Sequence, residues 1–172
     1  MASPQAYEPI EMTSPSELAG FAELYERHYE AVFRAALRVT GNPADAEDVL
    51  QTVFLRVLAR SGDAEAGGLP AAYFRRAAVN AAVDLLRRRA VHATSVYDDQ
   101  APHAASEPPL LLKERLRRAI ATLESDDAAL FLLRHVEGLS IEELAVMFQL
   151  EKNNVTVRLH RIRRRLQVEM QR

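Results

Sequence analysis

The chain has 172 residues, a formal net charge of −2 and no cysteine. This length allows one ordinary domain or two small helical ones, and the lack of cysteine excludes disulfides and thiolate metal sites. No apolar run approaches the roughly 20 residues that span a bilayer, and the polar, acidic start of the chain lacks the apolar core of a signal peptide. We therefore expect a cytoplasmic protein that does not insert into a membrane.

Charge is distributed unevenly along the chain. The formal balance is −4 for residues 1–60, +2 for 61–90, −3 for 91–110 and +3 for 111–172. Basic side chains cluster further, in the run Arg87-Arg88-Arg89 and between Arg158 and Arg165. Because phosphates respond to the field within about 8 Å, such clusters matter more than the net charge. Either run could also serve only helix-end complementation and solubility.

Two amphipathic helices are predicted near the start of the chain. Polar residues 1–16, with three prolines, are expected to be a disordered tail, and a first helical domain is expected over residues 17–89. The turn Gly41-Asn42-Pro43 joins its first two helices, and Asp45 is expected to be the N-cap of the second. Apolar residues of the second helix recur at helical spacing and predict a buried stripe: Ala46, Val49, Leu50, Val53, Phe54, Val57 and Leu58. Its outward residues include Asp48, Gln51, Thr52, Leu55 and Arg56.

A third helix is predicted over residues 71–89, after a loop at 61–70 that contains Gly67-Gly68 and Pro70. Its inward face is predicted to comprise Phe74, Ala77, Ala78, Ala81, Ala82 and Leu85. The opposite face then carries Tyr73, Arg76, Asn80, Asp84, Arg87 and Arg88. Rings and guanidinium planes stack on bases while arginines contact phosphates, which suits single-stranded DNA. Spacing alone is equally satisfied by a polar helix face with an Asp84–Arg88 ion pair.

A linker and a second helical domain complete the chain. Residues 90–109 contain Asp98, Asp99 and Glu107 but no basic residue, and are expected to be a flexible linker. Residues 110–172 are predicted to form helices only, with Ser140 and Glu143 as a capping box. A basic helix follows, with a buried stripe of Val155, Leu159, Ile162 and Leu166. A short helix pair followed by a basic helix is typical of a helix-turn-helix that enters the major groove. A helical hairpin in an ordinary bundle is the alternative.

Three segments in order resemble bacterial sigma factors of the extracytoplasmic-function (ECF) type, in the sigma-70 family. The run Asp45-Ala46-Glu47-Asp48 followed by Gln51, Phe54 and Arg56 is similar to the helix that binds core RNA polymerase. Residues 71–89 are similar to the helix that melts the promoter and holds the non-template strand, and residues 138–166 to the module that binds the upstream promoter element. The last segment is also similar to the DNA-binding modules of some response regulators. The resemblance implies an all-α fold of two small helical domains joined by a flexible linker.

The resemblance also implies partners and site residues. Core polymerase would contact Asp48, Gln51, Thr52, Leu55 and Arg56. Single-stranded promoter DNA would contact Tyr73, Arg76, Asn80, Arg87 and Arg88. Duplex DNA would contact Lys152, Asn153, Asn154, Thr156, Arg158 and Arg161. An anti-sigma factor is a further expected partner, and the linker resembles the segment that runs toward the polymerase active-site cleft.

The chain departs from the family pattern at several positions. Gln149 stands where the family has a turn glycine, and we expect a left-handed backbone there, which costs a non-glycine residue about 1 kcal/mol or more. Thr156 replaces a usual Lys or Arg and Val157 a usual Ser, while Tyr73 replaces a usual Trp. The loss of a cation at Thr156 and of a hydroxyl at Val157 would weaken phosphate anchoring or alter the sequence that is read, whereas Tyr73 bears on the strength of base stacking.

Other chemistry has little support in the sequence. The five histidines are scattered without metal-ligand spacing, and the sequence contains no phosphate-binding glycine loop, nucleophile elbow or zinc motif. We therefore expect neither an enzyme nor a cofactor, and favour an alternative sigma factor that directs promoter-specific initiation. Two alternatives stay open: a sigma-like polymerase- or protein-binding module without promoter recognition, and a stand-alone helix-turn-helix repressor.

Overall fold

The computed structural model describes residues 15–60, 69–94 and 109–171. Over these ranges the chain forms helices and no strand, which confirms the predicted all-α fold. The helices are α1 (Pro15–Thr40), α2 (Pro43–Arg60), α3 (Ala71–Thr94), α4 (Pro109–Ala121), α5 (Ser125–His135), α6 (Ile141–Phe148) and α7 (Lys152–Met170). The expectations for residues 1–14, for the loop at 61–68 and for the acidic side chains of the linker lie outside the described residues.

The turn between α1 and α2 is set by three consecutive residues. Gly41 has a positive φ of 68°, which glycine adopts without steric strain. Asn42 Oδ1 accepts hydrogen bonds from the backbone N–H groups of Ala44 (2.9 Å) and Asp45 (3.4 Å), and Pro43 occupies the first helical position that proline favours. The prediction that Asp45 caps α2 is therefore wrong, because Asn42 does so. Asp45 is instead a buried residue that forms an ion pair with Arg89 of α3.

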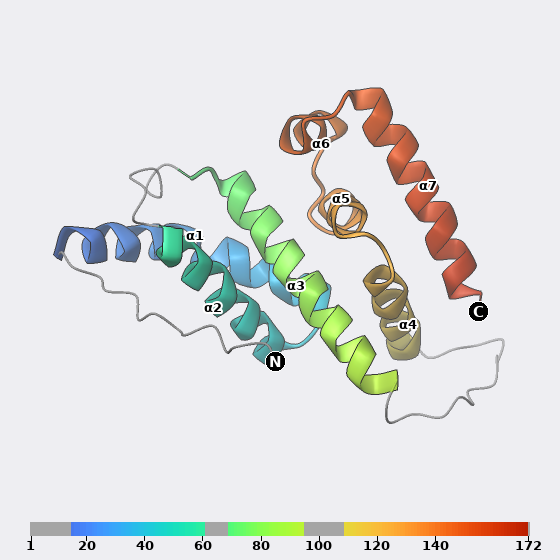
Figure 1. The fold of residues 1–172 in the computed structure, drawn as a ribbon, viewed down its shortest axis with the longest axis horizontal. Helices are drawn as coiled ribbons and strands as arrows, with labels where there is room; N and C mark the ends of the chain where they lie inside the picture. Colours follow the sequence, from blue (N-terminus) through green and yellow to red (C-terminus); the bar gives the residue numbers. More distant parts are fainter. Residues whose placement is uncertain (1–14, 61–68, 95–108, 172) are drawn as a thin grey trace, which may run out of the picture.

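Helices α1, α2 and α3 pack against one another around an apolar core (Figure 1). The predicted stripe of α2 is buried, apart from Leu58, which is half-buried. On α3 the buried residues include Phe74, Ala78, Ala81 and Ala82, as predicted. Helix α3 continues to Thr94, five residues into the segment expected to be linker.

The second half of the chain forms the predicted helix-turn-helix. Ser140 caps α6, with its side chain accepting from the Glu143 N–H (3.1 Å) and the Glu143 carboxylate accepting from the Ser140 N–H (2.7 Å). Gln149 has φ 54° and ψ 45°, so the expected left-handed conformation is present. The N–H of Leu150 donates to the carbonyl of Ala145 (2.9 Å), which closes the C-terminus of α6 in the usual left-handed manner. The predicted stripe of α7 is fully buried.

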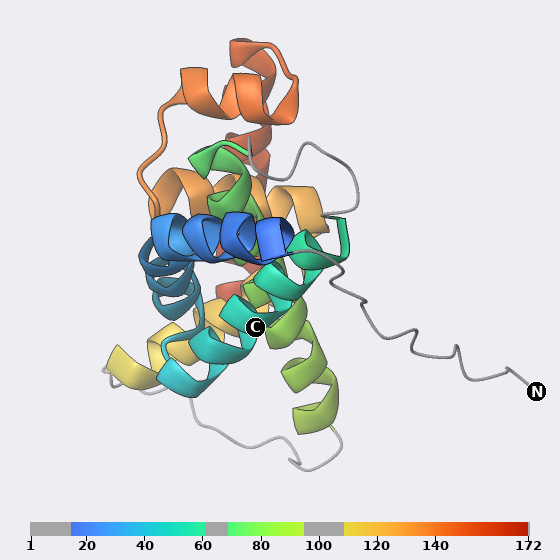
Figure 2. The same ribbon diagram turned by 90° about the vertical axis from the view of Figure 1, so that its left-hand side faces the viewer.

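Helix α3 lies between the two helical groups, as Figures 1 and 2 show. One side packs on α1 and α2, and the other packs on α4 and α5. Consequently Val79, Val83 and Leu86 are buried as well as most of the predicted inward face, of which Ala77 and Leu85 are half-buried. The sequence did not predict this second contact, and it determines the surroundings of the candidate site on α3.

Candidate polymerase and nucleic-acid interfaces

The outward face of α2 is open to solvent. Asp48, Gln51, Leu55 and Arg56 are exposed, Leu55 at 50%. Thr52 is half-buried, and its hydroxyl donates to the carbonyl of Asp48 (2.8 Å). Leu55 is exposed among polar side chains, and the apolar stripe of its helix is already buried. It is therefore free to contact another protein. The geometry is therefore compatible with the predicted polymerase contact.

The predicted strand-binding face of α3 is largely covered. Arg88 is exposed, but Tyr73, Arg76, Asn80 and Arg87 are half-buried. The sequence placed these side chains on a polar, outward face. In the structure that face turns toward α4, α5 and the end of α6, which half-buries most of it. The alternative Asp84–Arg88 pair is not the pair that forms, because Asp84 lies 3.5 Å from Arg87.

Arg87 is held by groups of the second domain. Its Nη2 donates to the carbonyl of Leu123 (2.5 Å), its Nε to the carbonyl of Ala121 (3.3 Å) and its Nη1 to the hydroxyl of Ser125 (2.7 Å). These acceptors lie where α4 ends and α5 begins. A cation at a helix C-terminus is favoured by the unpaired carbonyls and the helix dipole.

Arg76 has similar surroundings at the other end of the face. Its Nη1 donates to the carbonyl of Met147 in the last turn of α6 (2.9 Å), and its Nη2 lies 3.4 Å from Asp126. The guanidinium also lies 4.3 Å from the ring centroid of Phe148, a cation–π contact. Two of the three arginines that were assigned to single-stranded DNA, Arg76 and Arg87, therefore contact the chain's own second domain.

The N-terminal part of α7 presents most of the predicted duplex-binding residues to solvent. Lys152, Asn153, Asn154, Thr156 and Arg161 are exposed. Two cations on this helix are nevertheless paired within the chain.

Arg158 is half-buried and forms an ion pair with Asp127 of α5 (2.5 Å). Lys152 forms one with Glu142 of α6 (3.0 Å). The hydrogen bond from Lys152 is the main reason why the pKa of Glu142 lies below its ordinary value. Each pair ties α7 to a neighbouring helix of the helix-turn-helix.

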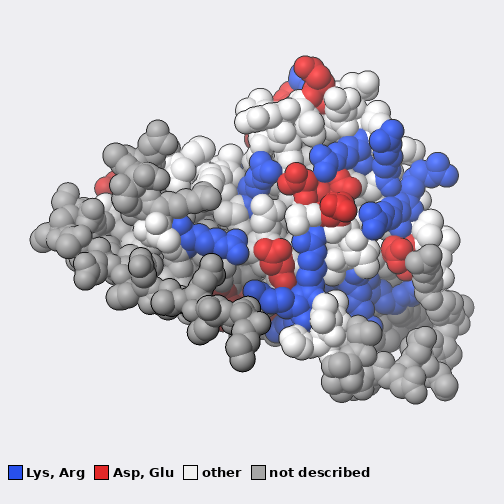
Figure 3. Space-filling view, viewed as in Figure 1, with Lys and Arg blue, Asp and Glu red and all other residues white. Residues whose placement is uncertain are grey.

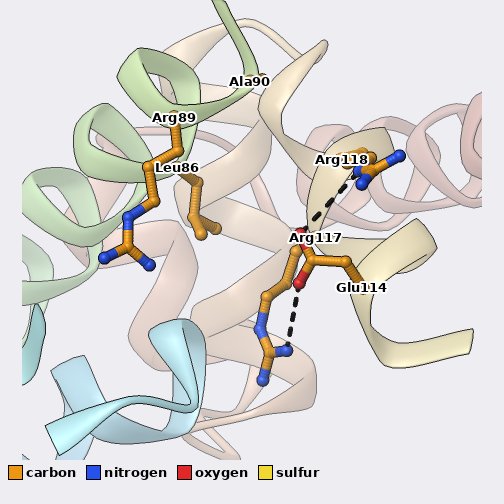
Figure 4. Close-up of a pocket in the computed structure, with 6 residues that line it drawn as sticks. All are labelled: Leu86, Arg89, Ala90, Glu114, Arg117 and Arg118. Atoms are coloured by element: carbon orange, nitrogen blue, oxygen red, sulfur yellow. Dashed lines mark ion pairs between the residues drawn. The ribbon is translucent and has the colours of Figure 1, made fainter. Parts of the chain in front are cut away.

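Basic side chains gather on one face of the molecule, over α7 and over the adjoining ends of α3 and α4, with acidic side chains among them (Figure 3). Three arginines surround a small cavity of about 40 Å³ between α3 and α4: Arg89, Arg117 and Arg118 (Figure 4). Glu114 lies 3.6 Å from Arg117 and 3.8 Å from Arg118. No role was predicted for α4, although its basic residues are a visible signal in the sequence.

Arg117 connects α4 to the first domain. Its Nε donates to the carbonyl of Val39 at the end of α1 (3.1 Å). A second link joins Arg38 of α1 to Glu137, which follows α5 (3.1 Å). Contacts between the two helical groups therefore involve α1 as well as α3.

Within the described ranges, no helix has the length and apolar character that crossing a bilayer requires.

The two halves of the chain match two regions of one protein family. Residues 24–91 match the family described as Sigma-70 region 2, and residues 113–166 match Sigma-70, region 4. The chain is 33% identical over 145 residues to the RNA polymerase sigma factor CarQ of Myxococcus xanthus, covering 82% of this chain and 83% of that protein. It is 31% identical over 152 residues to the ECF RNA polymerase sigma factor SigE of Mycolicibacterium smegmatis, covering 84% of this chain and 59% of that protein. The chain thus spans less than two thirds of the length of SigE.

Among solved structures, CnrH in complex with the cytosolic domain of CnrY aligns with a TM-score of 0.51 and 23% identity, over 86% of this chain and 85% of the matched chain. This likeness shows a shared fold. Region 2 covers α2 and most of α3, and region 4 covers most of the segment from α4 through the helix-turn-helix and α7. With both regions in their family order and CarQ related over most of both chains, the chain belongs to the ECF RNA polymerase sigma factors of the sigma-70 family.

Proposed function

We propose that this chain is an alternative sigma factor that binds core RNA polymerase and directs it to specific promoters. The observation that carries the proposal is the ordered pair of sigma-70 regions, 2 and 4, on one chain. It acts by binding rather than by catalysis, in the cytoplasm where the polymerase works. Core polymerase and promoter DNA are its partners.

Each helical domain has its own part in this function. The exposed face of α2, with Asp48, Gln51 and Leu55 at its centre, docks on the polymerase, and Thr52 and Arg56 extend that face. On α3, Tyr73, Arg76, Asn80, Arg87 and Arg88 take the non-template strand. The exposed N-terminal part of α7 contacts the upstream duplex. Aromatic and guanidinium groups on α3 supply sequence-tolerant stacking and phosphate contacts, whereas the polar side chains of α7 can read base edges in the major groove.

Reconstituted transcription tests this function. The chain is added to purified core polymerase with fragments of the native genome as templates. Discrete transcripts that require the chain are expected. Sequence-specific duplex binding should appear with the polymerase present and should decrease steeply with added salt, because phosphate neutralisation dominates the affinity. Tight specific binding by the chain alone at physiological salt would instead favour a repressor.

A polymerase-binding module without promoter recognition is a second candidate function. Its supporting observation is that Lys152 and Arg158 are already paired with Glu142 and Asp127, while Thr156 supplies no charge. Such a module would bind core polymerase and yield no promoter-specific transcript. The same reconstitution separates the two functions.

An inhibitory protein partner also belongs to this proposal. A groove of about 740 Å³, mostly apolar, lies between the start of α3 and α6, and its lining includes Tyr73, Val146 and Met147. Val146 is 80% exposed, so the groove offers apolar surface to a partner. The solved structure of CnrH, which shares this fold, is of a complex with the cytosolic domain of CnrY. We expect an anti-sigma factor that competes with core polymerase for this chain. Pull-down from the native cell, followed by competition with purified core polymerase, would test this expectation. A partner that binds together with polymerase would contradict this competition.

A further inference from the structure

We infer that the second domain closes over the strand-binding face of α3, so that the free chain occludes its own nucleic-acid site. In this closed arrangement, α3 lies against α4, α5 and the end of α6. The inference rests on the proposed function only for the identity of the displaced ligand, single-stranded DNA. The contact between the domains is a property of the chain itself.

Two arginines of the strand-binding face, Arg76 and Arg87, are held in the same way. Arg87 donates to two carbonyls where α4 ends, those of Ala121 and Leu123, and to the hydroxyl of Ser125. Arg76 donates to the carbonyl of Met147 where α6 ends. In both cases a guanidinium fork faces the C-terminus of a helix.

A helix C-terminus offers an arginine the same kind of acceptors as a phosphate does. Its last carbonyls are unpaired acceptors, and the helix dipole places partial negative charge on them. A phosphodiester offers the same guanidinium a full negative charge and several acceptor oxygens. Because Arg76 and Arg87 cannot serve both sets of acceptors at once, strand binding and closure exclude each other.

Phe148 adds a contact that resembles a stacked base. The Arg76 guanidinium lies 4.3 Å from the centroid of the Phe148 ring. Guanidinium planes also stack on nucleobases in single-stranded complexes. The second domain thus supplies both an aromatic face and carbonyl acceptors to the arginines of α3.

On this face of α3, a buried polar atom has no hydrogen-bond partner among the described residues. Asn80 lies four residues after Arg76 and seven before Arg87, on the same side of α3, and its Oδ1 is buried without a hydrogen bond from any described residue. An unpartnered buried acceptor destabilises the arrangement that buries it. This lowers the free energy needed to open the closed arrangement, because the amide regains water or a strand when the domains separate.

Apolar packing and two further links stabilise closure. Val79, Val83 and Leu86 of α3 are buried, on a helix that packs against α4 and α5. Arg117 donates to the carbonyl of Val39, and Arg38 pairs with Glu137. The second domain is therefore attached to both α1 and α3, and opening must break all of these contacts together.

A double-label energy-transfer measurement on the full chain tests the inference. The protein has no cysteine, so Glu26→Cys on α1 and Gln167→Cys on α7, both exposed positions, provide two unique labelling sites. The labelled pair reports the distance between the domains in the absence of polymerase. Arg87→Ala is compared with Arg88→Ala, which removes the same charge from the adjacent, exposed arginine.

We expect efficient transfer in the free wild-type chain. Arg87→Ala should raise the ratio of open to closed chains about tenfold, the effect of losing charge-assisted hydrogen bonds at a partly buried site. Arg88→Ala should leave the ratio unchanged. Arg87→Lys should have an intermediate effect, since it keeps the charge but not the fork, and it covers the case in which Arg87→Ala fails to fold. Far-ultraviolet circular dichroism verifies the helicity of each variant.

A short single-stranded oligonucleotide of mixed sequence provides the second arm. Transfer in the wild-type chain should fall as the oligonucleotide saturates, and Arg76→Ala together with Arg87→Ala should lower transfer before any is added. Equal transfer in Arg87→Ala and Arg88→Ala, or saturation with transfer unchanged, would overturn the inference. If wild-type chain directs transcription while Arg87→Ala leaves transfer unchanged, closure is rejected and the proposed function stands. If Arg87→Ala opens the chain while the wild-type chain yields no transcript, closure stands and the proposed function is rejected.

Discussion

Gly41 and Arg117 lie in direct contact, although they belong to different helical domains. A Cβ atom on Gly41 would lie 2.8 Å from Cζ of Arg117 and closer still to Nη2. Gly41 also has a φ of 68°, a conformation that side chains disfavour. The turn between α1 and α2 therefore needs glycine for its backbone and for the approach of α4.

Replacing Gly41 by Ala is expected to destabilise the protein for both reasons. The left-handed conformation alone costs roughly 1–2 kcal/mol, and the new methyl group displaces the Arg117 guanidinium from the carbonyl of Val39. Urea unfolding of Gly41→Ala, Arg117→Ala and the double variant measures the two parts. If the displacement of Arg117 matters, the double variant will lose less unfolding free energy than the two single variants lose in sum. Strict additivity would show that backbone strain accounts for the whole effect.

Asn80→Ala should stabilise the closed chain and weaken strand binding. It removes a buried acceptor that has no hydrogen-bond partner in the described part of the chain, an arrangement that costs about 1–3 kcal/mol. It also removes an amide that would contact the strand. We expect a higher urea midpoint, a smaller open population and a higher dissociation constant for a single-stranded oligonucleotide.

Asn154→Ala is the control for Asn80→Ala, since Asn154 is exposed on α7. It should leave the open population and strand binding unchanged. A lower urea midpoint in Asn80→Ala would mean that the amide stabilises the folded chain through its other atoms.

Stability should fall as the solution becomes mildly acidic, because of His28. This residue is 7% exposed and its ring is stacked on Phe74, with centroids 4.0 Å apart. Burial, and secondarily the charge of Arg27, lower the pKa of His28 below its ordinary value of 6.5. The unfolded chain therefore takes up this proton at a higher pH than the folded chain, so acid favours unfolding.

Urea unfolding between about pH 7.5 and about pH 5.5 checks this dependence, above the range in which carboxylates titrate. In His28→Gln, the free energy of unfolding should decrease less over this pH range than in the wild-type chain. His135 should contribute with the same sign, since burial, Arg163 and Arg134 lower its pKa, and His28→Gln with His135→Gln should reduce the decrease further. A wild-type chain whose stability rises on acidification would contradict this expectation.

Local features of the fold were predictable from the sequence. The stripe of α7, the capping box at Ser140 and the left-handed Gln149 each depend on residues within a few positions of one another, so spacing and residue type are sufficient to predict them. The exposed face of α2 follows from its stripe in the same way. Asp45 was wrongly assigned because an equally good cap, Asn42, lies beside a proline that starts the helix earlier.

The surroundings of α3 could not be predicted from spacing. Periodicity shows that Arg76, Asn80 and Arg87 point away from the core of their own domain, but it does not show what else lies there. The partners of Arg76 and Arg87 in the second domain are 34 to 71 positions further along the chain, at Ala121 and Met147 among others. Two helix C-termini can approach these arginines only when the second domain is folded and in place. Contacts of this kind depend on tertiary packing and leave no periodic signal.

The polymerase assignment on α2 predicts a separation of binding from stability. Asp48→Arg with Gln51→Ala should abolish association with core polymerase, because both side chains lie on the exposed face. The thermal midpoint should stay within a few degrees of wild type, since surface substitutions change stability by about 0.5 kcal/mol or less. Glu47→Ala, an exposed neighbour on the same helix, is the control and should retain binding. Survival of binding in the double variant would show that another surface docks.

The last prediction concerns the ion pair between Arg158 and Asp127. Arg158 was assigned to duplex DNA, yet it lies 2.5 Å from Asp127 and both side chains are partly buried. If the pair withholds Arg158 from the phosphates, Asp127→Asn will increase promoter affinity in the presence of core polymerase. The slope of log K against log salt will then steepen by about 0.9, the value for one additional phosphate contact on duplex DNA. Glu124→Gln removes an equal charge at a nearby exposed position and should leave that slope unchanged. Lower affinity in Asp127→Asn, matching that of Arg158→Ala, would instead show that Asp127 positions Arg158 for the duplex.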